Sequence, residues 1–255
     1  AHTTGLNKTT ISSLVDELLA QRWIYEIGLD NSGGGRPAML LGLKPEAGCI
    51  IGLEIGVDFV SAIVTDFSGQ IIWRKLLETE STTPQERIVN RALRLIDEDR
   101  AIDSAQDGDL LGIGLTVPGM VDIQQGLLLF SPNLQWRNVA LRQIFRDHTN
   151  LPVFADNDAK AAALGEHFFG EARHIQNFIF LTLGIGIGGG LFLDGGLYRG
   201  AGGLAGEIGH NNLTGDRGRP CRCGNRGCWE TTGNQYALIE RVQALLEAGR
   251  NSLVS

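Results

Sequence analysis

The sequence contains Gly206-Glu-Ile-Gly-His210 and, after ten further residues, Cys221-Arg-Cys-Gly-Asn-Arg-Gly-Cys228-Trp-Glu230. Three cysteines and a histidine so close together offer three thiolates and one imidazole, the tetrahedral ligand set that a structural Zn²⁺ ion prefers. Residues 221–228 form a short cysteine loop, in which Gly224 and Gly227 let the backbone fold back so that the three sulfur atoms can converge. We therefore predict a structural zinc site whose four ligands are His210, Cys221, Cys223 and Cys228. The alternatives are a reduced cysteine cluster and a disulfide, which the cytosol disfavours.

Residues 45–255, which surround this pattern, alternate between strand-like and helix-like hydrophobic runs. The predicted strands cover 49–55, 59–65, 71–77, 110–117, 153–155, 178–183 and 189–193, and the predicted helices cover 84–99, 139–149, 158–169 and 236–248. Tight turns join the first three strands, so they should form antiparallel hairpins that feed a mixed sheet. Hairpins followed by strands that alternate with helices are typical of an α/β fold. Cys49 lies in an apolar strand and is expected in the core.

Residues 1–44 follow a different pattern, that of a partial winged helix-turn-helix. A helix is predicted over 7–20, with Asn7 as its N-cap and an apolar stripe along one face. A short strand over 23–27, a glycine-rich turn and a second strand over 38–43 follow. Gly5 stands where the tight turn before a recognition helix is expected. We interpret this segment as a DNA-binding domain, with a module used only for protein contacts as the alternative.

The residues expected to contact DNA lie in two places within this segment. Short polar side chains near the start of the helix suit phosphate and base-edge contacts in the major groove. Gly35-Arg36-Pro37 resembles the core of hooks that enter a narrow minor groove, which attracts arginine. The predicted DNA-binding residues are Lys8, Thr9, Thr10, Ser12 and Arg36.

The composition restricts the class of protein. With 43% hydrophobic and 20% charged residues, the 255-residue chain is typical of soluble globular proteins. We expect a cytoplasmic protein without contact to a membrane, because no apolar run approaches the roughly 20 residues of a membrane helix and no signal-peptide pattern is present. A net charge of −7 argues against binding of nucleic acid over the whole surface. No methionine precedes Ala1, and we expect the chain to be a fragment.

The combined glycine, histidine, cysteine and glutamate spacing of residues 206–230 resembles the signature of the ROK family of bacterial sugar kinases and sugar-responsive repressors. The motifs span roughly residues 50–230, and the winged-helix segment in front of them matches the repressor branch. This resemblance implies an actin-like (ribonuclease H-like) α/β fold with two lobes. We assign 45–172 to the first lobe and 173–255 to the second.

Two glycine hairpins hold ATP in ROK kinases, and both are altered here. The first resembles Asp-x-Gly-Gly-Thr-Lys, but the matching stretch, residues 54–59, has Asp58 in place of threonine and Phe59 in place of lysine. A carboxylate beside a triphosphate is repulsive. The second, Gly-Thr-Gly-x-Gly-Gly in kinases, has Ile185 in place of the hydroxyl. The resemblance therefore implies a sensor derived from a kinase that no longer uses ATP.

The sugar-binding positions of the family are retained. The matching residues are Asn133, Asn157, Asp158, Glu207, His210 and Glu230. Carboxylates and carboxamides suit the many hydroxyl groups of a sugar. Asp158 matches the catalytic base of the kinases, and without ATP we interpret it as a hydroxyl acceptor. Taken singly, Asp158 could be a helix N-cap and Asn133 a turn residue.

The sequence therefore predicts a transcriptional repressor of carbohydrate metabolism that binds operator DNA as a homodimer or homotetramer and responds to a sugar or sugar phosphate. One alternative is an active ATP-dependent ROK kinase of the hexokinase or glucokinase type. Another is regulation by a sugar-transport protein.

Overall fold

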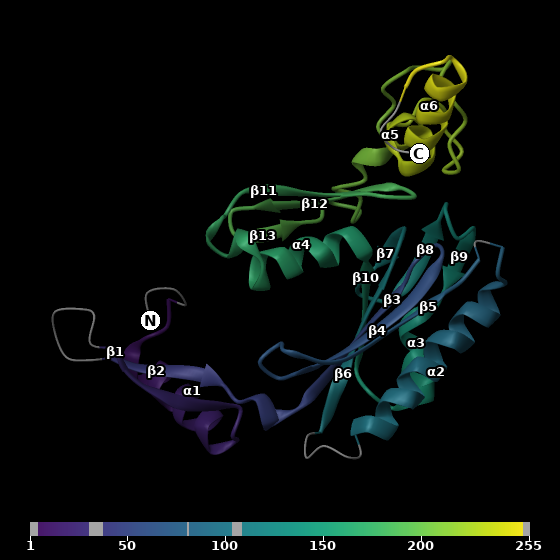
Figure 1. The fold of residues 1–255 in the computed structure, drawn as a ribbon. Helices are drawn as coiled ribbons and strands as arrows, with labels where there is room; N and C mark the ends of the chain where they lie inside the picture. Colours follow the sequence, from purple (N-terminus) through teal and green to yellow (C-terminus); the bar gives the residue numbers. More distant parts are fainter. Residues whose placement is uncertain (1–4, 31–37, 81, 104–108, 252–255) are drawn as a thin grey trace.

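The computed structural model describes residues 5–30, 38–80, 82–103 and 109–251. The described strands form four sheets (Figure 1). A two-stranded hairpin lies near the N-terminus, a five-stranded sheet forms the largest body, and a three-stranded sheet lies above it in the view of Figure 1. None of the described helices is long and apolar enough to cross a membrane.

The N-terminal unit consists of helix α1 (Lys8–Ala20) and the antiparallel hairpin of β1 (Ile24–Asp30) and β2 (Ala38–Leu43). The predicted helix and both predicted strands are confirmed. Asn7 caps the helix, because its side chain accepts a hydrogen bond from the backbone N–H of Thr10 at 2.8 Å. Helix α1 has no buried residue, so its polar first turn is open to solvent.

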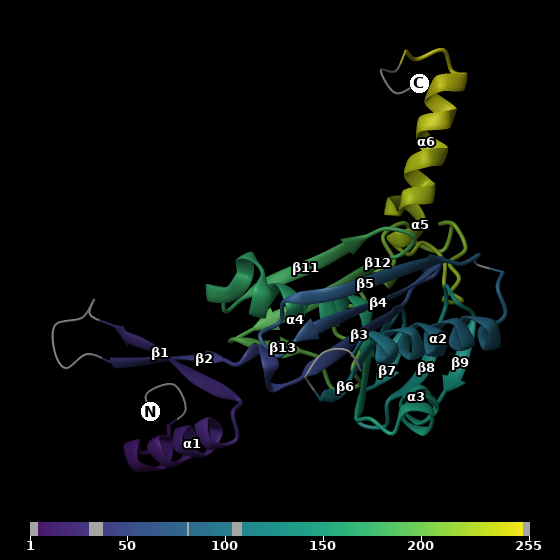
Figure 2. The same cartoon turned by 60° about the horizontal axis from the view of Figure 1, so that its bottom comes forward.

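The five-stranded sheet has the order β10-β6-β3-β4-β5. Its strands are β3 (Cys49–Ile55), β4 (Phe59–Asp66), β5 (Ile71–Glu78), β6 (Leu110–Val117) and β10 (Val153–Asn157). The first three form an antiparallel meander, β6 pairs in parallel with β3, and β10 pairs in parallel with β6 at the edge. Helices α2 (Gln85–Asp103) and α3 (Leu141–Thr149) pack together on one face (Figures 1 and 2).

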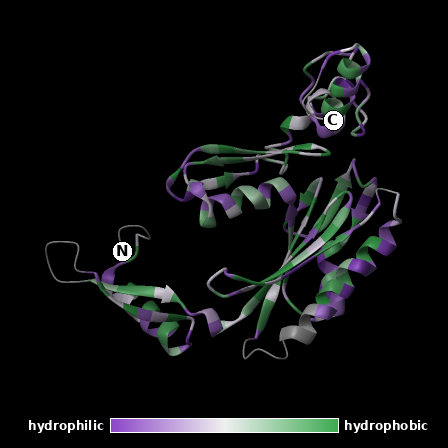
Figure 3. Ribbon diagram, in the orientation of Figure 1, coloured by the Kyte–Doolittle hydropathy of each residue, from purple (hydrophilic) through white to green (hydrophobic). Residues whose placement is uncertain are grey.

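The main core lies between this sheet and its two helices. Alternate residues of β3, from Cys49 to Ile55, point into it, as a period of two requires. Helix α2 contributes a stripe spaced by about one turn: Ile88, Ala92, Leu95 and Ile96. Figure 3 shows the consequence, with largely hydrophobic strands and an α2 that is hydrophobic on one side only.

A small antiparallel sheet was not predicted. It comprises β7 (Met120–Asp122), β8 (Leu127–Ser131) and β9 (Trp136–Val139). The helix predicted from residue 139 begins only at Leu141, because Val139 is buried as the last residue of β9. Asn133 lies in the turn that connects β8 to β9.

The second sheet comprises β11 (Phe178–Leu183), β12 (Ile187–Leu193) and β13 (Gly196–Tyr198), all antiparallel. Helix α4 (Asp158–Phe169) packs on it, and a Cβ at Gly190 would collide with Ala163, so only glycine allows this close approach. The remaining elements are the 3₁₀ turns η1 (Pro45–Ala47), η2 (Glu171–His174) and η3 (Ile208–His210), and helices α5 (Glu230–Gly233) and α6 (Gln235–Glu247).

The turn between β4 and β5 has packed neighbours on two sides. The rings of Phe67 and Trp23 meet edge to face with centroids 5.0 Å apart, which links this turn to the base of the N-terminal hairpin. A Cβ at Gly69 would lie 2.8 Å from the ring of Phe169, the last residue of α4. The turn therefore lies between the N-terminal unit and the far end of α4.

Candidate functional site

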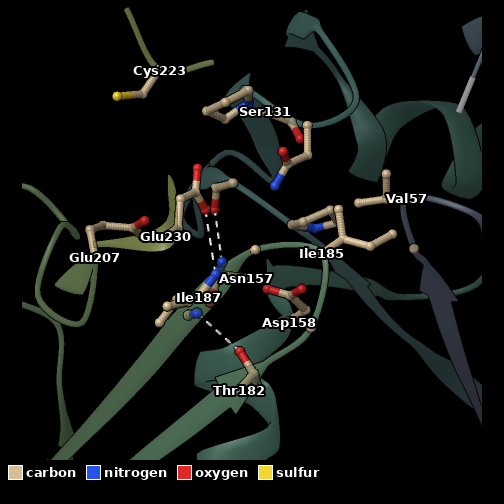
Figure 4. Close-up of a pocket in the computed structure, with 18 of the residues that line it drawn as sticks. Val57, Ser131, Asn157, Asp158, Thr182, Ile185, Ile187, Glu207, Cys223 and Glu230 are labelled. Atoms are coloured by element: carbon tan, nitrogen blue, oxygen red, sulfur yellow. Dashed lines mark hydrogen bonds between the residues drawn. The ribbon is translucent and has the colours of Figure 1, made fainter. Parts of the chain in front are cut away.

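A cavity of about 610 Å³ opens between the five-stranded sheet and the sheet of β11, β12 and β13. It is lined by the β3–β4 turn, the β8–β9 loop, the start of α4, the β11–β12 hairpin, and segments around η3 and α5. All six residues predicted to bind sugar line it: Asn133, Asn157, Asp158, Glu207, His210 and Glu230. Figure 4 shows Glu207 and Glu230 on one side of this space, with Val57 and Ile185 on the other.

The junction of β10 and α4 places two of these residues. Asn157 caps α4, because its Oδ1 accepts a hydrogen bond from the Lys160 N–H at 3.0 Å, while its Nδ2 donates to the Gly119 carbonyl at 3.0 Å. Asp158 is therefore not the N-cap but the first helical residue, and its carboxylate faces the cavity. Asn133 is a turn residue, as one alternative held, and it lines the cavity as well.

Glu207 reaches the cavity from a segment that passes against β12. Gly206 has a φ of +91°, and a Cβ there would collide with the Gly189 carbonyl oxygen, so the position requires glycine. Lys160 approaches from α4 on the other side, and its Nζ lies 3.2 Å from Glu207 Oε1 and 2.7 Å from the Gly203 carbonyl oxygen.

The cavity lining is strongly acidic. Its carboxylates are those of Glu54, Asp58, Asp158, Glu207 and Glu230. None of the described lining residues is a lysine or arginine. Burial raises the pKa of Asp158, and the charge of Glu207 raises it further, against the opposing effects of the Ala159 N–H and Lys160. Burial raises the pKa of Glu54 as well, and the charge of Asp158 adds to it.

The histidine and three cysteines of the predicted metal site come together. One ligand atom from each of His210, Cys221, Cys223 and Cys228 lies within 4.8 Å of the others, so these residues can hold a metal ion. The sulfur atoms of Cys223 and Cys228 are 3.7 Å apart, much longer than the roughly 2.05 Å of a disulfide bond. Burial raises the pKa of the Cys221 and Cys228 thiols. A cation bound there would reverse this effect, since thiols coordinate as thiolates.

Glu230 joins this metal centre to the cavity. Only 6% of the residue is exposed. Its Oε1 lies 3.2 Å from the Cys221 sulfur and 3.7 Å from His210 Nδ1, and its Oε2 accepts a hydrogen bond from the Ile187 N–H at 3.4 Å. The carboxylate therefore contacts the cysteine loop and the β11–β12 hairpin at once (Figure 4).

The two glycine hairpins form the less polar wall. The ring of Phe59 packs against Gly56 in the first hairpin, where it leaves no room for a Cβ. In the second, Ile185 and Ile187 line the cavity, and Thr182 Oγ1 accepts a hydrogen bond from the Gly188 N–H at 3.1 Å. Thr182 was not singled out from the sequence, because it precedes the glycine motif and lies within an ordinary apolar strand.

The residues predicted to bind DNA lie away from this cavity. Lys8, Thr9, Thr10 and Ser12 are all exposed on the first turns of α1. Arg36 lies outside the residues that the structure describes.

Known proteins similar to the chain fall into two groups. Residues 50–252 match the model of the ROK family. A xylose repressor from Caldicellulosiruptor bescii is 38% identical over 244 residues, which are 96% of this chain and 61% of the repressor. The chain thus spans about three fifths of the length of the curated repressors that it matches.

Solved structures show the same division. A ROK family transcriptional regulator, described as a homolog of the E. coli MLC protein, is 29% identical with a TM-score of 0.80, over 98% of this chain and 63% of the regulator. A ROK family glucokinase from Streptomyces griseus in complex with glucose and AMPPNP is 34% identical with a TM-score of 0.69, over 79% of this chain and 62% of the kinase. Together with the family match over four fifths of its length, these likenesses establish that the chain belongs to the ROK family.

Proposed function

We propose that the chain is part of a cytoplasmic, sugar-responsive transcriptional repressor of carbohydrate-metabolism genes. The observation that carries this proposal is the attachment of an exposed helix and hairpin, residues 8–43, to a sugar-kinase-like body. The likeness to the ROK regulator extends over 98% of the chain, whereas the likeness to the glucokinase covers 79%. A likeness that extends over nearly the whole chain for the regulator, and over less of it for the glucokinase, favours a regulator.

The N-terminal unit is the back half of a winged helix-turn-helix in this proposal. Lys8, Thr9, Thr10 and Ser12 lie along the exposed start of α1, where a recognition helix presents its N-terminal residues to the major groove. Arg36, in the connection between β1 and β2, enters the adjacent minor groove. Two such units in a homodimer or homotetramer bind a symmetric operator.

The effector is a sugar that binds in the cavity. Asn133, Asn157, Asp158, Glu207, His210 and Glu230 read its hydroxyl groups. Because five carboxylates and no lysine or arginine line the described cavity, an uncharged sugar fits better than a sugar phosphate. Closure of the lobes on the sugar changes the placement of the N-terminal units, and operator affinity with it.

The residues of the two glycine hairpins argue against the kinase alternative. Asp58 and Phe59 in the first hairpin and Ile185 in the second offer the phosphates of ATP neither a cation nor a hydroxyl. Asp158 then serves as an acceptor for a sugar hydroxyl.

The metal is Zn²⁺, held by His210, Cys221, Cys223 and Cys228. Four protein ligands leave no open position, which is the arrangement of a structural site. When bound, the ion fixes the cysteine loop. Glu230 is then held in the cavity wall by its contacts with Cys221 and the Ile187 N–H, and His210 is held there as a ligand of the ion.

The full-length protein tests this proposal. An operator is selected from random duplexes, and its affinity is measured by fluorescence anisotropy with and without D-xylose and D-glucose. We expect a sugar to change operator affinity by about 5- to 150-fold, the usual range of an allosteric coupling. Thr10→Ala should alter base preference within a half-site. ATP-dependent phosphorylation of either sugar, with no selected operator, would support the kinase instead.

A further inference from the structure

We propose that Lys160 is a positioning residue of the sugar cavity, which holds Glu207 and the backbone of residues 199–207 in the binding geometry. This inference rests on the proposed function, since it assigns the support of that same site. At this junction, the resemblance to the family identified Asn157 and Asp158, and Lys160 follows two residues after Asp158.

The burial of Lys160 is the first observation. Only 3% of the residue is exposed, and lysine is almost never so buried unless it is paired. Its Nζ donates to the Gly203 carbonyl at 2.7 Å and lies 3.2 Å from Glu207 Oε1. These contacts join the first turn of α4 to two points of the same segment. Desolvation of a buried ammonium is costly without partners, so the two contacts fix the position of the Lys160 side chain.

The charge of Lys160 is the second observation. Five carboxylates line the cavity, and none of the described lining residues carries a guanidinium or ammonium group. Lys160 lies just behind the lining. Two ionisable groups from different elements act on Asp158: Glu207 from the segment before η3 and Lys160 from α4. Glu54 of β3 faces Asp158 as well, and the charge of Asp158 raises the pKa of Glu54. Of these, Lys160 is the cation, and it lowers the pKa of Asp158. It therefore favours the charged carboxylate that accepts a bond from a sugar hydroxyl.

A second ion pair holds the same segment and provides a matched control. Arg199 binds Asp156 in a bidentate manner, with N–O distances of 2.8 and 2.5 Å. Neither residue lines the cavity. Neither Arg199 nor Asp156 is among the groups that shift the Asp158 pKa, so loss of this pair should loosen one end of the segment with little effect on that pKa.

The test compares Lys160→Met, Lys160→Gln and Arg199→Met with the parent chain. Calorimetry with D-xylose and D-glucose, which do not titrate, gives the affinity from about pH 5 to pH 8. Hydrogen exchange of the amides of residues 199–207, in protein without sugar, reports on the segment itself. Glutamine keeps a donor for the Gly203 carbonyl but no charge, so it separates the hydrogen bond from the ionic role.

We expect Lys160→Met to weaken sugar binding roughly tenfold or more, because the half-buried Glu207 carboxylate loses its partner. The loss of affinity toward low pH should begin at a higher pH than in the parent, since the Asp158 pKa rises without Lys160. Lys160→Gln should show the same change of pH profile with slower amide exchange than Lys160→Met. Arg199→Met should exchange faster than the parent but keep the parental pH profile.

Two results would overturn the proposal. One is parental affinity and pH profile in Lys160→Met; the other is unchanged amide exchange of residues 199–207 in the same variant. Full recovery of affinity and pH profile in Lys160→Gln would support positioning through the hydrogen bond to the Gly203 carbonyl, without a role for the charge. If the parent binds neither sugar, the proposed function fails. The exchange measurement is independent of that outcome: faster exchange in Lys160→Met supports the positioning role, and unchanged exchange refutes it.

Discussion

The two walls of the cavity differ in how their side chains are held. On one wall, Glu207 and Glu230 are carboxylates with defined partners, Lys160 for the first and the Ile187 N–H for the second. On the other, Val57, Phe59 and Ile185 are apolar and lie beside the carboxylate of Asp58. Asp58, Phe59 and Ile185 stand at the positions where ROK kinases carry hydroxyl and lysine groups for ATP. Buried polar groups are costly without partners, and the carboxylates of the first wall have partners within the chain. The first wall thus keeps the residues to which the proposed function assigns sugar binding, whereas the second lacks the groups that the family resemblance assigns to ATP binding.

Loss of the metal centre should have the largest effect on the polar wall. Cys228→Ser removes a buried ligand, and we expect loss of bound zinc, disorder of the cysteine loop and no measurable sugar binding. The free energy at stake is large, about 10–16 kcal/mol for structural zinc in small peptides. Elemental analysis with sugar calorimetry measures it, and Cys49→Ala, a buried cysteine in β3, should keep its zinc. A parent chain that folds with a zinc ratio near zero would contradict the assignment.

Substitution of single polar residues of the cavity should have the next largest effect on sugar binding. Asn133→Ala and Glu230→Gln should each weaken sugar binding by about 1–3 kcal/mol, because a buried hydroxyl loses its partner. Gln135→Gly is the control, since Gln135 is exposed in the same loop, does not line the cavity and has a φ of +58° that suits glycine. Unchanged affinity in both Asn133→Ala and Glu230→Gln would place the ligand elsewhere.

The acidic lining should cost stability at neutral pH. Burial raises the pKa of Asp158, so its protonated form is favoured in the folded chain, and this stabilisation is lost as pH rises through that pKa. Asp158→Asn should therefore raise the free energy of unfolding at pH 7, by on the order of 1 kcal/mol, while sugar binding weakens. The gain should shrink as the pH falls and the parent carboxyl becomes protonated. Thermal unfolding at several pH values measures it, and a gain that grows toward low pH would be inconsistent with this origin.

The smallest effect is expected on the apolar wall. The parent should bind no AMPPNP, and Asp58→Thr with Phe59→Lys and Ile185→Thr should bring only weak, detectable binding. The reason is that one cation and two hydroxyls return, but the acidic surroundings remain. Titration calorimetry with AMPPNP and Mg²⁺ measures this. Tight binding by the parent would erase the difference between the two walls.

The regular elements of the fold were predictable, and the connections that carry side chains into the cavity were less so. The strand over Leu110–Val117 and the helix over Asp158–Phe169 were predicted with their observed bounds, because each has a clear pattern and flanking turn residues. β7, β8 and β9 were missed, since they are short and separated by proline, glycine and asparagine. Such strands are stabilised by tertiary packing, which local propensity does not report.

The candidate site was predicted by motif, and its supports were not. The six cavity residues and four metal ligands stand at characteristic spacings, so the sequence alone identified them. Lys160 and Thr182 act through partners far along the chain, at Glu207 and Gly188 in turn. A lysine after a helix N-cap is ordinarily exposed, so nothing in the sequence marks this one as buried.

The β4–β5 turn connects the far end of α4 to the N-terminal hairpin, so α4 links the cavity to that hairpin. The helix has 12 residues and is about 18 Å long, with Asp158 at the cavity and Phe169 against Gly69. A tilt of about 5° around its first turn would carry Phe169 by about 1.5 Å, comparable to the helix shifts of known switches. The exposed ring of Phe169 touches this turn at Gly69, and Phe67 of the same turn contacts Trp23, so the turn is the route by which such a displacement would reach the N-terminal hairpin. In the proposed repressor, the displacement at the N-terminal hairpin would then scale with the length of one helix, and the ligand would not need to touch the N-terminal unit.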